Sequence, residues 1–246
     1  MEKMIRQLRI SYFRDKVRSC PDIRLGYKNT KNGQVMVVSR FDNTKRAEEH
    51  RCNTKRGTEL IGLMDKCDDY KRIESKLESE WINTYKTPCR SVEFKHFGNT
   101  RNRRLFDSFK ERCNNYKSTT STFYNGKKYK SKLESDFAKL MDEYGIPYKY
   151  EPEITYAGTE TMDPVFIIYL PWLDLLILVE IFGACDDVKY LKRNRLKLHY
   201  YMLEGWIPGW NMLALYYTGE TSYIREMVMK EIENIEIRKY LSVYNR

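Results

Sequence analysis

The stretch that decides the fold is residues 163–183, DPVFIIYLPWLDLLILVEIFG. It holds two apolar, β-rich runs, residues 165–170 and 175–181, joined by a turn at residues 171–174. Strands that are apolar on both faces are typical of the middle of a sheet that other elements cover on both sides. We therefore expect a central β-hairpin here, with the carboxylate of Glu180 near its end.

The segments on either side of this hairpin have the periodicities of helices and strands. The Asn125-Gly126 pair between aromatic residues predicts a tight turn. Ser131 is placed as the N-cap of a helix and Glu134 as its capping-box partner. In chain order we predict a hairpin at 123–129, a helix at 131–144, a strand at 148–156, the central hairpin, a helix at 187–204, a strand at 210–217 and a helix at 222–241. This order predicts the α/β class, with a mixed central β-sheet flanked by helices.

Basic residues are concentrated in the first half of the chain. The formal net charge of the 246 residues is +10, and residues 1–120 hold 28 Lys and Arg against 16 Asp and Glu, whereas residues 121–246 hold 16 against 18. Such a surplus attracts polyanions, of which nucleic acid is the commonest, although solubility alone is the plainer explanation. We expect a basic nucleic-acid-binding region at residues 1–118 and a second domain at residues 119–246, with the Ser/Thr-rich residues 118–122 at their boundary.

The basic N-terminal region is expected to be α+β. Two β-rich runs at 23–27 and 34–41, separated by an Asn-Gly turn, predict a hairpin, and residues 45–85 have the spacing of one or two amphipathic helices. Clustered Lys and Arg position nucleic acid through its phosphates, so we expect the hairpin and the basic residues 101–117 to contact phosphates. The residues that we assign to nucleic-acid binding are Arg101, Arg103, Arg104, Lys110, Arg112, Lys127, Lys128, Lys192 and Arg193.

The six cysteines contain no C-x-x-C pair, which predicts neither a zinc ribbon nor a disulfide framework. We expect reduced thiols and a cytoplasmic location. A zinc site at His50, Cys52 and Cys67 is a weaker alternative, because its spacing fits no standard pattern. The first residues show no signal peptide, and Asp174 interrupts the longest apolar run, so we expect no membrane partner.

Two carboxylates stand at the same end of the predicted central hairpin. Asp163 precedes its first strand and Glu180 lies near the end of the second, so antiparallel pairing brings them together. Hydrolysis of a phosphodiester at neutral pH commonly uses a divalent cation, and Mg²⁺ or Mn²⁺ takes hard oxygen ligands. Asp163 and Glu180 are therefore the candidate metal ligands. Asp174, at the other end of the hairpin, is a weaker competitor.

These residues resemble the PD-(D/E)XK nuclease superfamily, with the likeness carried mainly by residues 123–183. In that family a helix contributes a Glu, here Glu134. A strand contributes the Asp of a Pro-Asp pair, here Asp163 in the reversed order Asp163-Pro164, and the next strand contributes the Glu of Glu-x-Lys, here Glu180. The resemblance implies a restriction-endonuclease-like fold, phosphodiesterase activity and Mg²⁺ or Mn²⁺ as cofactor. We find no family match for residues 1–118.

One departure from the family pattern is Phe182, which stands where the pattern has its lysine. Some members that resemble helicase-associated nucleases carry a lysine in the following helix, between two tyrosines and before a glycine. This chain has Tyr190, Lys197, Tyr201 and Gly205 at those intervals, and positions 190, 197 and 201 share one helical face. Two interpretations follow: Lys197 replaces the missing lysine, or the scaffold is inactive.

Together these residues predict a metal-dependent endonuclease that acts on DNA, with Glu134, Asp163, Glu180 and Lys197 as catalytic residues. The alternative is a catalytically inactive nuclease-fold protein that binds nucleic acid or serves as a structural or interaction module, for example by docking its basic half on an acidic protein. Each residue also has a plainer interpretation: Glu134 as a cap, Asp163 as a turn residue and Lys197 as part of a solvated basic face. Many nucleases of this type that cut both strands act as dimers, so a homodimer is possible here, but the sequence identifies no dimer surface.

Overall fold

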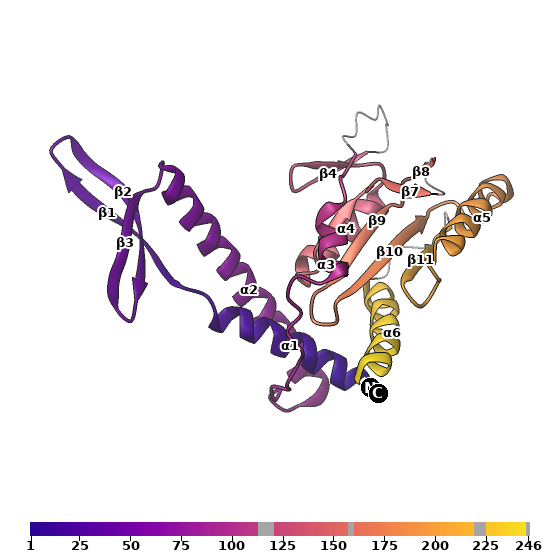
Figure 1. Cartoon of the computed structure of the whole chain (residues 1–246), viewed down its shortest axis with the longest axis horizontal. Coiled ribbons are helices and arrows are strands. Elements are labelled where there is room, and N and C mark those ends of the chain that lie inside the picture. The colour runs from indigo at the N-terminus through magenta and orange to yellow at the C-terminus, as the bar shows by residue number, and fades with distance from the viewer. Residues whose placement is uncertain (113–120, 157–159, 219–224, 245–246) are drawn as a thin grey trace. The chain divides into compact units, whose positions relative to one another are not determined.

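The computed structural model describes residues 1–112, 121–156, 160–218 and 225–244 of the chain (Figure 1). These residues form two compact units: an N-terminal unit of residues 6–93, and a C-terminal unit of residues 94–246 together with residues 1–5. Residues 94–112 thus belong with the C-terminal half, although the charge pattern groups them with the basic N-terminal region. Most of the boundary segment expected at residues 118–122 lies outside the described residues.

Two helices and a three-stranded antiparallel sheet build the N-terminal unit. The strand order is β1-β2-β3, and β1 and β2 confirm the predicted hairpin. Helix α2 packs on this sheet and buries Leu60, Ile73, Leu77 and Trp81. The elements are α1 (Glu2–Arg18), β1 (Asp22–Thr30), β2 (Gly33–Asp42), β3 (Lys45–Arg51) and α2 (Lys55–Tyr85).

The prediction of a helix from residue 45 onward is wrong for residues 45–51, which form the strand β3. A single helix, α2, begins at Lys55, where Thr54 caps it by accepting the N–H of Gly57 at 3.1 Å. A Cβ on Gly57 would lie 2.1 Å from the main-chain oxygen of Arg51, so only glycine allows the end of β3 to pass this close to the helix. The sequence pattern also does not predict α1.

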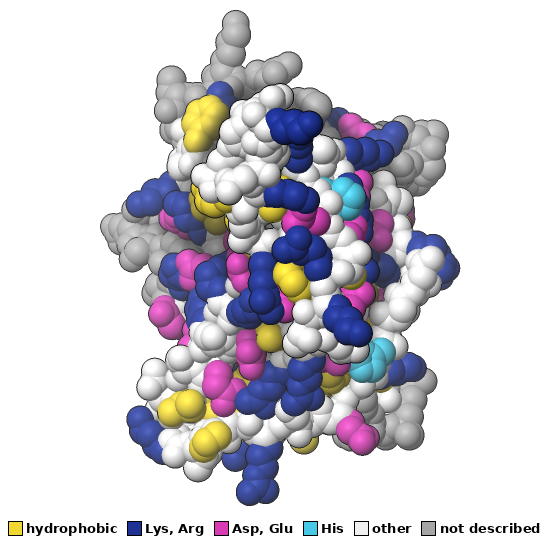
Figure 2. Space-filling view, turned by 90° about the vertical axis from the view of Figure 1, so that its left-hand side faces the viewer, with side chains coloured by type: hydrophobic (Ala, Val, Ile, Leu, Met, Phe, Trp, Pro, Cys, Tyr) yellow, Lys and Arg dark blue, Asp and Glu magenta, His cyan; other side chains and the backbone are white. Residues whose placement is uncertain are grey.

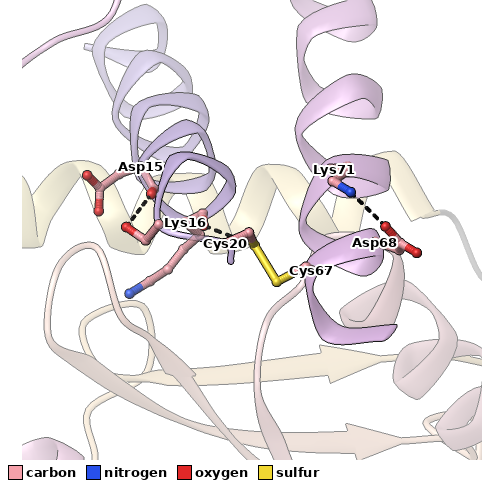
Figure 3. The surroundings of a disulfide bond; sticks show 7 residues. Asp15, Lys16, Cys20, Cys67, Asp68 and Lys71 are labelled. Carbon is pink, nitrogen blue, oxygen red and sulfur yellow. Dashed lines mark hydrogen bonds and ion pairs between the residues drawn. A yellow bond between two sulfur atoms is a disulfide. The ribbon is translucent and has the colours of Figure 1, made fainter. Parts of the chain in front are cut away.

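A disulfide bond joins Cys20, which follows α1, to Cys67 on α2 (Figure 3), with their Cα atoms 5.8 Å apart. This bond corrects the expectation of reduced thiols for these two residues, and it removes Cys67 from the zinc alternative with His50 and Cys52. The two cysteines are 47 residues apart in the sequence, so their spacing gives no local signal of the pairing. Cys113 lies outside the described residues.

A four-stranded mixed sheet is the core of the C-terminal unit (Figure 1). Its strand order is β11-β10-β9-β6, in which β10 and β11 run parallel and the other neighbours run antiparallel. All residues of the two inner strands are buried, which confirms the predicted central hairpin and the mixed α/β class. The elements are α3 (Arg101–Ser108), β4 (Thr122–Tyr124), β5 (Lys127–Tyr129), α4 (Lys132–Glu143), β6 (Tyr148–Tyr150), β7 (Ile154–Tyr156), β8 (Glu160–Met162), β9 (Phe166–Leu170), β10 (Leu175–Phe182), α5 (Val188–Leu203), β11 (Met212–Tyr216) and α6 (Arg225–Tyr244).

Helices cover both faces of this mixed sheet. On one face, Phe166 of β9 meets Phe137 of α4, with ring centroids 4.8 Å apart. On the other face, Tyr169 of β9 stacks on Phe106 of α3 at 5.5 Å. The strand register pairs Tyr169 with Leu176, and side chains alternate along a strand, so Leu178 and Glu180 share this second face. Helix α5 packs there, because its Tyr201 belongs to one buried cluster with Leu178.

Several segments of this unit differ from the sequence prediction. The single strand expected at residues 148–156 is broken into β6 and β7, because Glu151 has a positive φ of 44° and Pro152 cannot donate a ladder hydrogen bond. Strand β8 and helix α3 are additional elements, and residues 222–224 of the last predicted helix lie outside the described residues. None of the helices in the described part of the chain combines the length and apolar character that a membrane crossing requires.

Candidate active site

Glu180 lies near the end of the inner strand β10 and is almost completely buried, with a side chain that is 3% exposed. Three donors reach its carboxylate: Lys197 Nζ and Tyr201 Oη, each 2.6 Å from Oε1, and the main-chain amide of Val165. Burial raises the pKa of Glu180, and the ammonium group of Lys197 acts in the opposite direction. Glu180 is therefore a desolvated carboxylate held in one orientation by three donors.

Lys197 extends from α5 and links the two candidate metal ligands. Its Nζ lies 2.6 Å from Oε1 of Glu180 and donates to the main-chain oxygen of Asp163 at 3.0 Å. Tyr190 of the same helix accepts the N–H of Gly183 at 3.3 Å, just after β10. The shared helical face predicted for positions 190, 197 and 201 is confirmed, because all three side chains reach β10 or the residue after it. Lys197 is thus more than a member of a solvated basic face.

Asp163 lies shortly before β9, and its two side-chain oxygens have different surroundings. Oδ2 pairs with Nη1 of Arg112. Oδ1 is buried and has no hydrogen-bond partner among the described residues. Leaving a carboxylate oxygen buried without a donor is energetically costly, and groups of this kind are concentrated where a ligand or ion supplies the missing interaction. Asp163 therefore offers one acceptor that the described part of the chain does not satisfy.

Glu134, the third predicted catalytic carboxylate, is engaged by donors that hold the start of α4. Its Oε2 accepts the N–H of Lys130 at 2.9 Å and the Oη of Tyr150 at 2.6 Å. Ser131 caps the helix as predicted by accepting the N–H of Glu134 at 3.2 Å. Burial raises the pKa of Glu134. The cap at Ser131 is confirmed, whereas Glu134 accepts the N–H of Lys130 and not the N–H of Ser131 that a capping box would use. A catalytic role for Glu134 stays a prediction.

Glu151 is a candidate functional residue that the sequence pattern does not single out. It is 3% exposed, it has the positive φ noted above, and its Oε2 has no hydrogen-bond partner among the described residues, while Oε1 pairs with Lys130. Its N–H donates to the main-chain oxygen of Val165 at 3.0 Å, so it lies beside the residue whose amide holds Glu180. Backbone strain at a buried polar residue is frequent at functional sites. The signal in the sequence is the Glu151-Pro152 pair inside a predicted strand.

Phe182, which replaces the lysine in the resemblance drawn from the sequence, is part of the packing of the sheet. Its ring stacks on Tyr216 of β11, with centroids 5.1 Å apart. The amine that contacts the carboxylate of Glu180 belongs instead to Lys197.

Asp174 lies at the opposite end of the central hairpin and cannot share a cation with Glu180. Six positions along an extended strand span about 20 Å. Its Oδ1 accepts the Oγ1 of Thr100 at 2.5 Å and the Oη of Tyr169 at 3.0 Å, and its main-chain oxygen accepts Nδ2 of Asn102 at 2.7 Å. Asp174 thus fastens α3 to the turn between β9 and β10.

Three of the predicted nucleic-acid-binding residues, Arg101, Arg103 and Arg104, lie on α3. The cap of this helix is Thr100, which binds Asp174, so these arginines are at the end of the hairpin away from Glu180. Arg103 pairs with Asp107 at 2.9 Å and Arg104 donates to the main-chain oxygen of Asn99 at 2.7 Å. The structure does not bring these arginines together with the candidate metal ligands.

Three others, Arg112, Lys127 and Lys128, line one cavity beside Asp163. Arg112 reaches it from the segment that precedes residue 113, and the two lysines come from β5. The remaining predicted phosphate contacts are exposed side chains, Lys110 near Arg112, and Lys192 and Arg193 on the helix that carries Lys197.

Many basic side chains of the N-terminal unit are paired with carboxylates. Lys28 and Arg46 both contact Glu49, at 2.6 and 2.5 Å, and Arg56 contacts Glu48 at 2.8 Å. Figure 2 shows one face of the molecule, on which Lys and Arg side chains are interspersed with Asp and Glu side chains. The phosphate-binding role expected for the β1–β2 hairpin stays a prediction.

The candidate site is a pair of carboxylates and not a larger acidic cluster. Among the described residues, no group of three or more His, Cys, Asp or Glu side chains is arranged to hold a metal ion. Two cationic side chains, Arg112 and Lys197, balance Asp163 and Glu180.

The chain matches no protein-family model, no curated protein and no solved structure.

Proposed function

We propose that the chain is a metal-dependent nuclease that hydrolyses phosphodiester bonds, most simply in DNA, within a restriction-endonuclease-like domain. The observation that carries this proposal is the arrangement at the end of the central hairpin. One ammonium group, Lys197 Nζ, contacts both Glu180 and the main chain of Asp163, and the side chain of Asp163 keeps one buried oxygen that no donor among the described residues reaches.

Asp163 and Glu180 are the residues that would hold a divalent cation. Their hard carboxylate oxygens suit Mg²⁺ or Mn²⁺, and Oδ1 of Asp163 is an acceptor without a partner among the described residues. A carboxylate pair is sufficient, because Mg²⁺ commonly takes its other ligands from water and substrate phosphates. Such a cation, when bound, lowers the pKa of a water and offsets negative charge on the phosphate.

The side chains around this pair have separate roles in the proposed reaction. Tyr201 and the amide of Val165 fix the orientation of Glu180, and Arg112 orients Asp163. Lys197 is placed to orient the attacking water and to offset the charge that develops on the phosphate. This is the role that the family's Glu-x-Lys lysine would have if Phe182 did not occupy its position.

The direct test is cleavage of a substrate panel by the purified full chain. Single-stranded, duplex and branched DNA, and RNA, are incubated with Mg²⁺, with Mn²⁺ or with EDTA. We expect at least one substrate to be cut with either metal and none with EDTA. The Glu180→Gln variant should abolish cleavage, because it removes the buried negative charge while keeping the shape of the side chain.

A matched control is Glu226→Gln, which makes the same chemical change at an exposed glutamate in the first turn of α6. It should cut at the parental rate. Intact substrates throughout the panel, or equal rates for the parent and Glu180→Gln, would contradict the proposal.

The second candidate function is nucleic-acid binding without cleavage, and the packing of Phe182 on Tyr216 favours it. Under this alternative, Asp163→Asn binds nucleic acid like the parent and no condition yields cleavage. For a nuclease, Asp163→Asn loses cleavage and keeps most of its binding, so cleavage and binding measured on the same variant separate the two functions.

A further inference from the structure

A basic cavity lies next to Asp163, within the C-terminal unit. It has a volume of about 200 Å³ and is lined by Glu111, Arg112, Lys127, Lys128 and Tyr150. This is ample room for a phosphate group together with several water molecules.

Main-chain pairing builds one wall of this cavity. The segment before residue 113 runs beside the strand break at Glu151, with a β-bridge between Glu111 and Pro152. The N–H of Arg112 donates to the oxygen of Glu151 at 3.2 Å, and the N–H of Glu153 donates to the oxygen of Lys110 at 3.1 Å. Arg112 is thereby fixed at an edge of the fold instead of extending from a loose loop.

The side chain of Glu111 connects this wall to β5. One of its oxygens accepts the main-chain N–H of Tyr150 at 2.7 Å, and both accept from Lys127 Nζ, at 2.8 and 2.7 Å. Lys127 and Lys128 follow the tight turn at Asn125-Gly126 and begin β5. The residues that line the cavity contribute three cationic side chains and one carboxylate, and Arg112 is also paired with Asp163 and Glu153.

The cavity and the candidate metal ligands share one side chain. Arg112 lines the cavity and also pairs with Asp163 through Nη1. An anion held by Arg112, Lys127 and Lys128 would therefore lie one side chain away from the site where we place bond cleavage.

We infer that this cavity binds a phosphate of the nucleic-acid strand that neighbours the phosphate being hydrolysed. The inference rests on the proposed function for the identity of the second phosphate. Arg112, Lys127 and Lys128 supply the contacts, and Glu111 is a positioning residue for Lys127. The cavity reads no base, so it fixes the register of the strand over Asp163 without selecting sequence.

The first test measures binding of the full chain to a labelled oligonucleotide in EDTA, as a function of salt concentration. The test variant is Lys127→Gln/Lys128→Gln. The matched control is Lys71→Gln/Lys230→Gln, which also removes two positive charges. Lys71 and Lys230 lie outside the cavity, and each pairs with a carboxylate. Because each phosphate contact contributes about 0.7 to 0.9 to the slope of log K against log salt, we expect the slope to fall by about one unit in the test variant and much less in the control.

The second test uses oligonucleotides that carry one uncharged methylphosphonate. In Mg²⁺, the parent should cut the bond at one fixed distance from the methylphosphonate about tenfold more slowly than the neighbouring bonds. The test variant should cut that bond and its neighbours at similar rates. Equal salt slopes for the test and control variants, an unchanged avoidance pattern, or a parent chain that binds no oligonucleotide would overturn the inference. Binding with the expected slopes but no cleavage in any metal would instead overturn the proposed nuclease and leave an anion-binding cavity.

Discussion

The central hairpin carries an aspartate close to each of its ends, and the two differ in how their oxygens are satisfied. At the turn, the side chain of Asp174 accepts hydrogen bonds from Thr100 and Tyr169, and its main-chain oxygen accepts one from Asn102. These hydrogen bonds hold α3 to the turn. At the open end, Asp163 has one oxygen paired with Arg112 and one that is buried without a partner among the described residues. A satisfied carboxylate stabilises a fold, whereas an unsatisfied one costs stability and keeps the capacity to bind a ligand.

The largest expected effect follows from making the same substitution at both aspartates. Asp163→Asn should lower cleavage about a thousandfold, which is the order of loss when one electrostatic group is removed from an active site. Asp174→Asn should change it less than about threefold, because Asn keeps an acceptor and tolerates the positive φ of 46° at this position. Single-turnover rates of the two variants and the parent check this. A larger loss of cleavage in Asp174→Asn than in Asp163→Asn would mean that the active site lies at the turn end of the hairpin.

The next effect concerns the ammonium group at the open end. Lys197→Met should slow cleavage by about a hundredfold, the usual order for one proton-transfer or charge-stabilising group. It should also lower the free energy of unfolding by about 1–3 kcal/mol, because the carboxylate of Glu180 stays buried while its cation is removed. Lys189→Met, at an exposed position of the same helix, is the matched control and should leave both quantities nearly unchanged.

A double-mutant cycle sharpens this prediction. In a Glu180→Gln background no buried charge is left to compensate, so the stability cost of Lys197→Met should shrink well below its cost in the parent. Urea unfolding of the four proteins gives the coupling. Equal costs in both backgrounds would mean that the contact between Lys197 and Glu180 contributes nothing to stability.

At the turn, stability and not rate should be the sensitive quantity. Asp174→Ala removes the acceptor of Thr100 and Tyr169 and places a less tolerant residue at a positive φ, so we expect a loss of about 2–3 kcal/mol. Cleavage measured well below the melting temperature should stay within about threefold of the parent. Thermal unfolding together with rates checks both statements, and a variant as stable as the parent would remove the structural role of Asp174.

The parts of the fold that follow from the sequence are those specified by local patterns. Two dense apolar runs predict the central hairpin, and Ser131 with Glu134 predicts the start of α4. Lys197 could also be predicted, because its spacing from Tyr190 and Tyr201 places all three on one face of a helix.

What the sequence does not predict depends on partners that are distant along the chain. Strand β3 reads KRAEEHR, with no apolar alternation, and it is held to its surroundings by pairing with β2 and by ion pairs such as Glu48 with Arg56. The disulfide of Cys20 and the placement of Arg112 against Asp163 likewise join residues about 50 positions apart. No periodicity in a short window contains that information, so the polar lining of the candidate site could be predicted only in part.

Glu134 could have a structural role, like Asp174, or a functional role, like Asp163. The smallest predicted effect distinguishes these two roles. Its side chain is half-buried and accepts from two donors, yet desolvation raises its pKa above the value in the unfolded chain. The folded state therefore holds the proton to higher pH than the unfolded state, so the contribution of Glu134 to stability falls as pH rises from about 4.3 through the raised pKa and is constant above it. Glu134→Gln does not titrate at this position, so the stability of the variant relative to the parent should increase over that pH window.

Ser131→Ala, which removes the cap of the same helix, should lower the free energy of unfolding by about 1 kcal/mol at every pH and serves as the control. Parallel curves for Glu134→Gln and the parent would show that the carboxyl group ionises normally, and a large loss of cleavage without any change in stability would place Glu134 with Asp163 and not with Asp174.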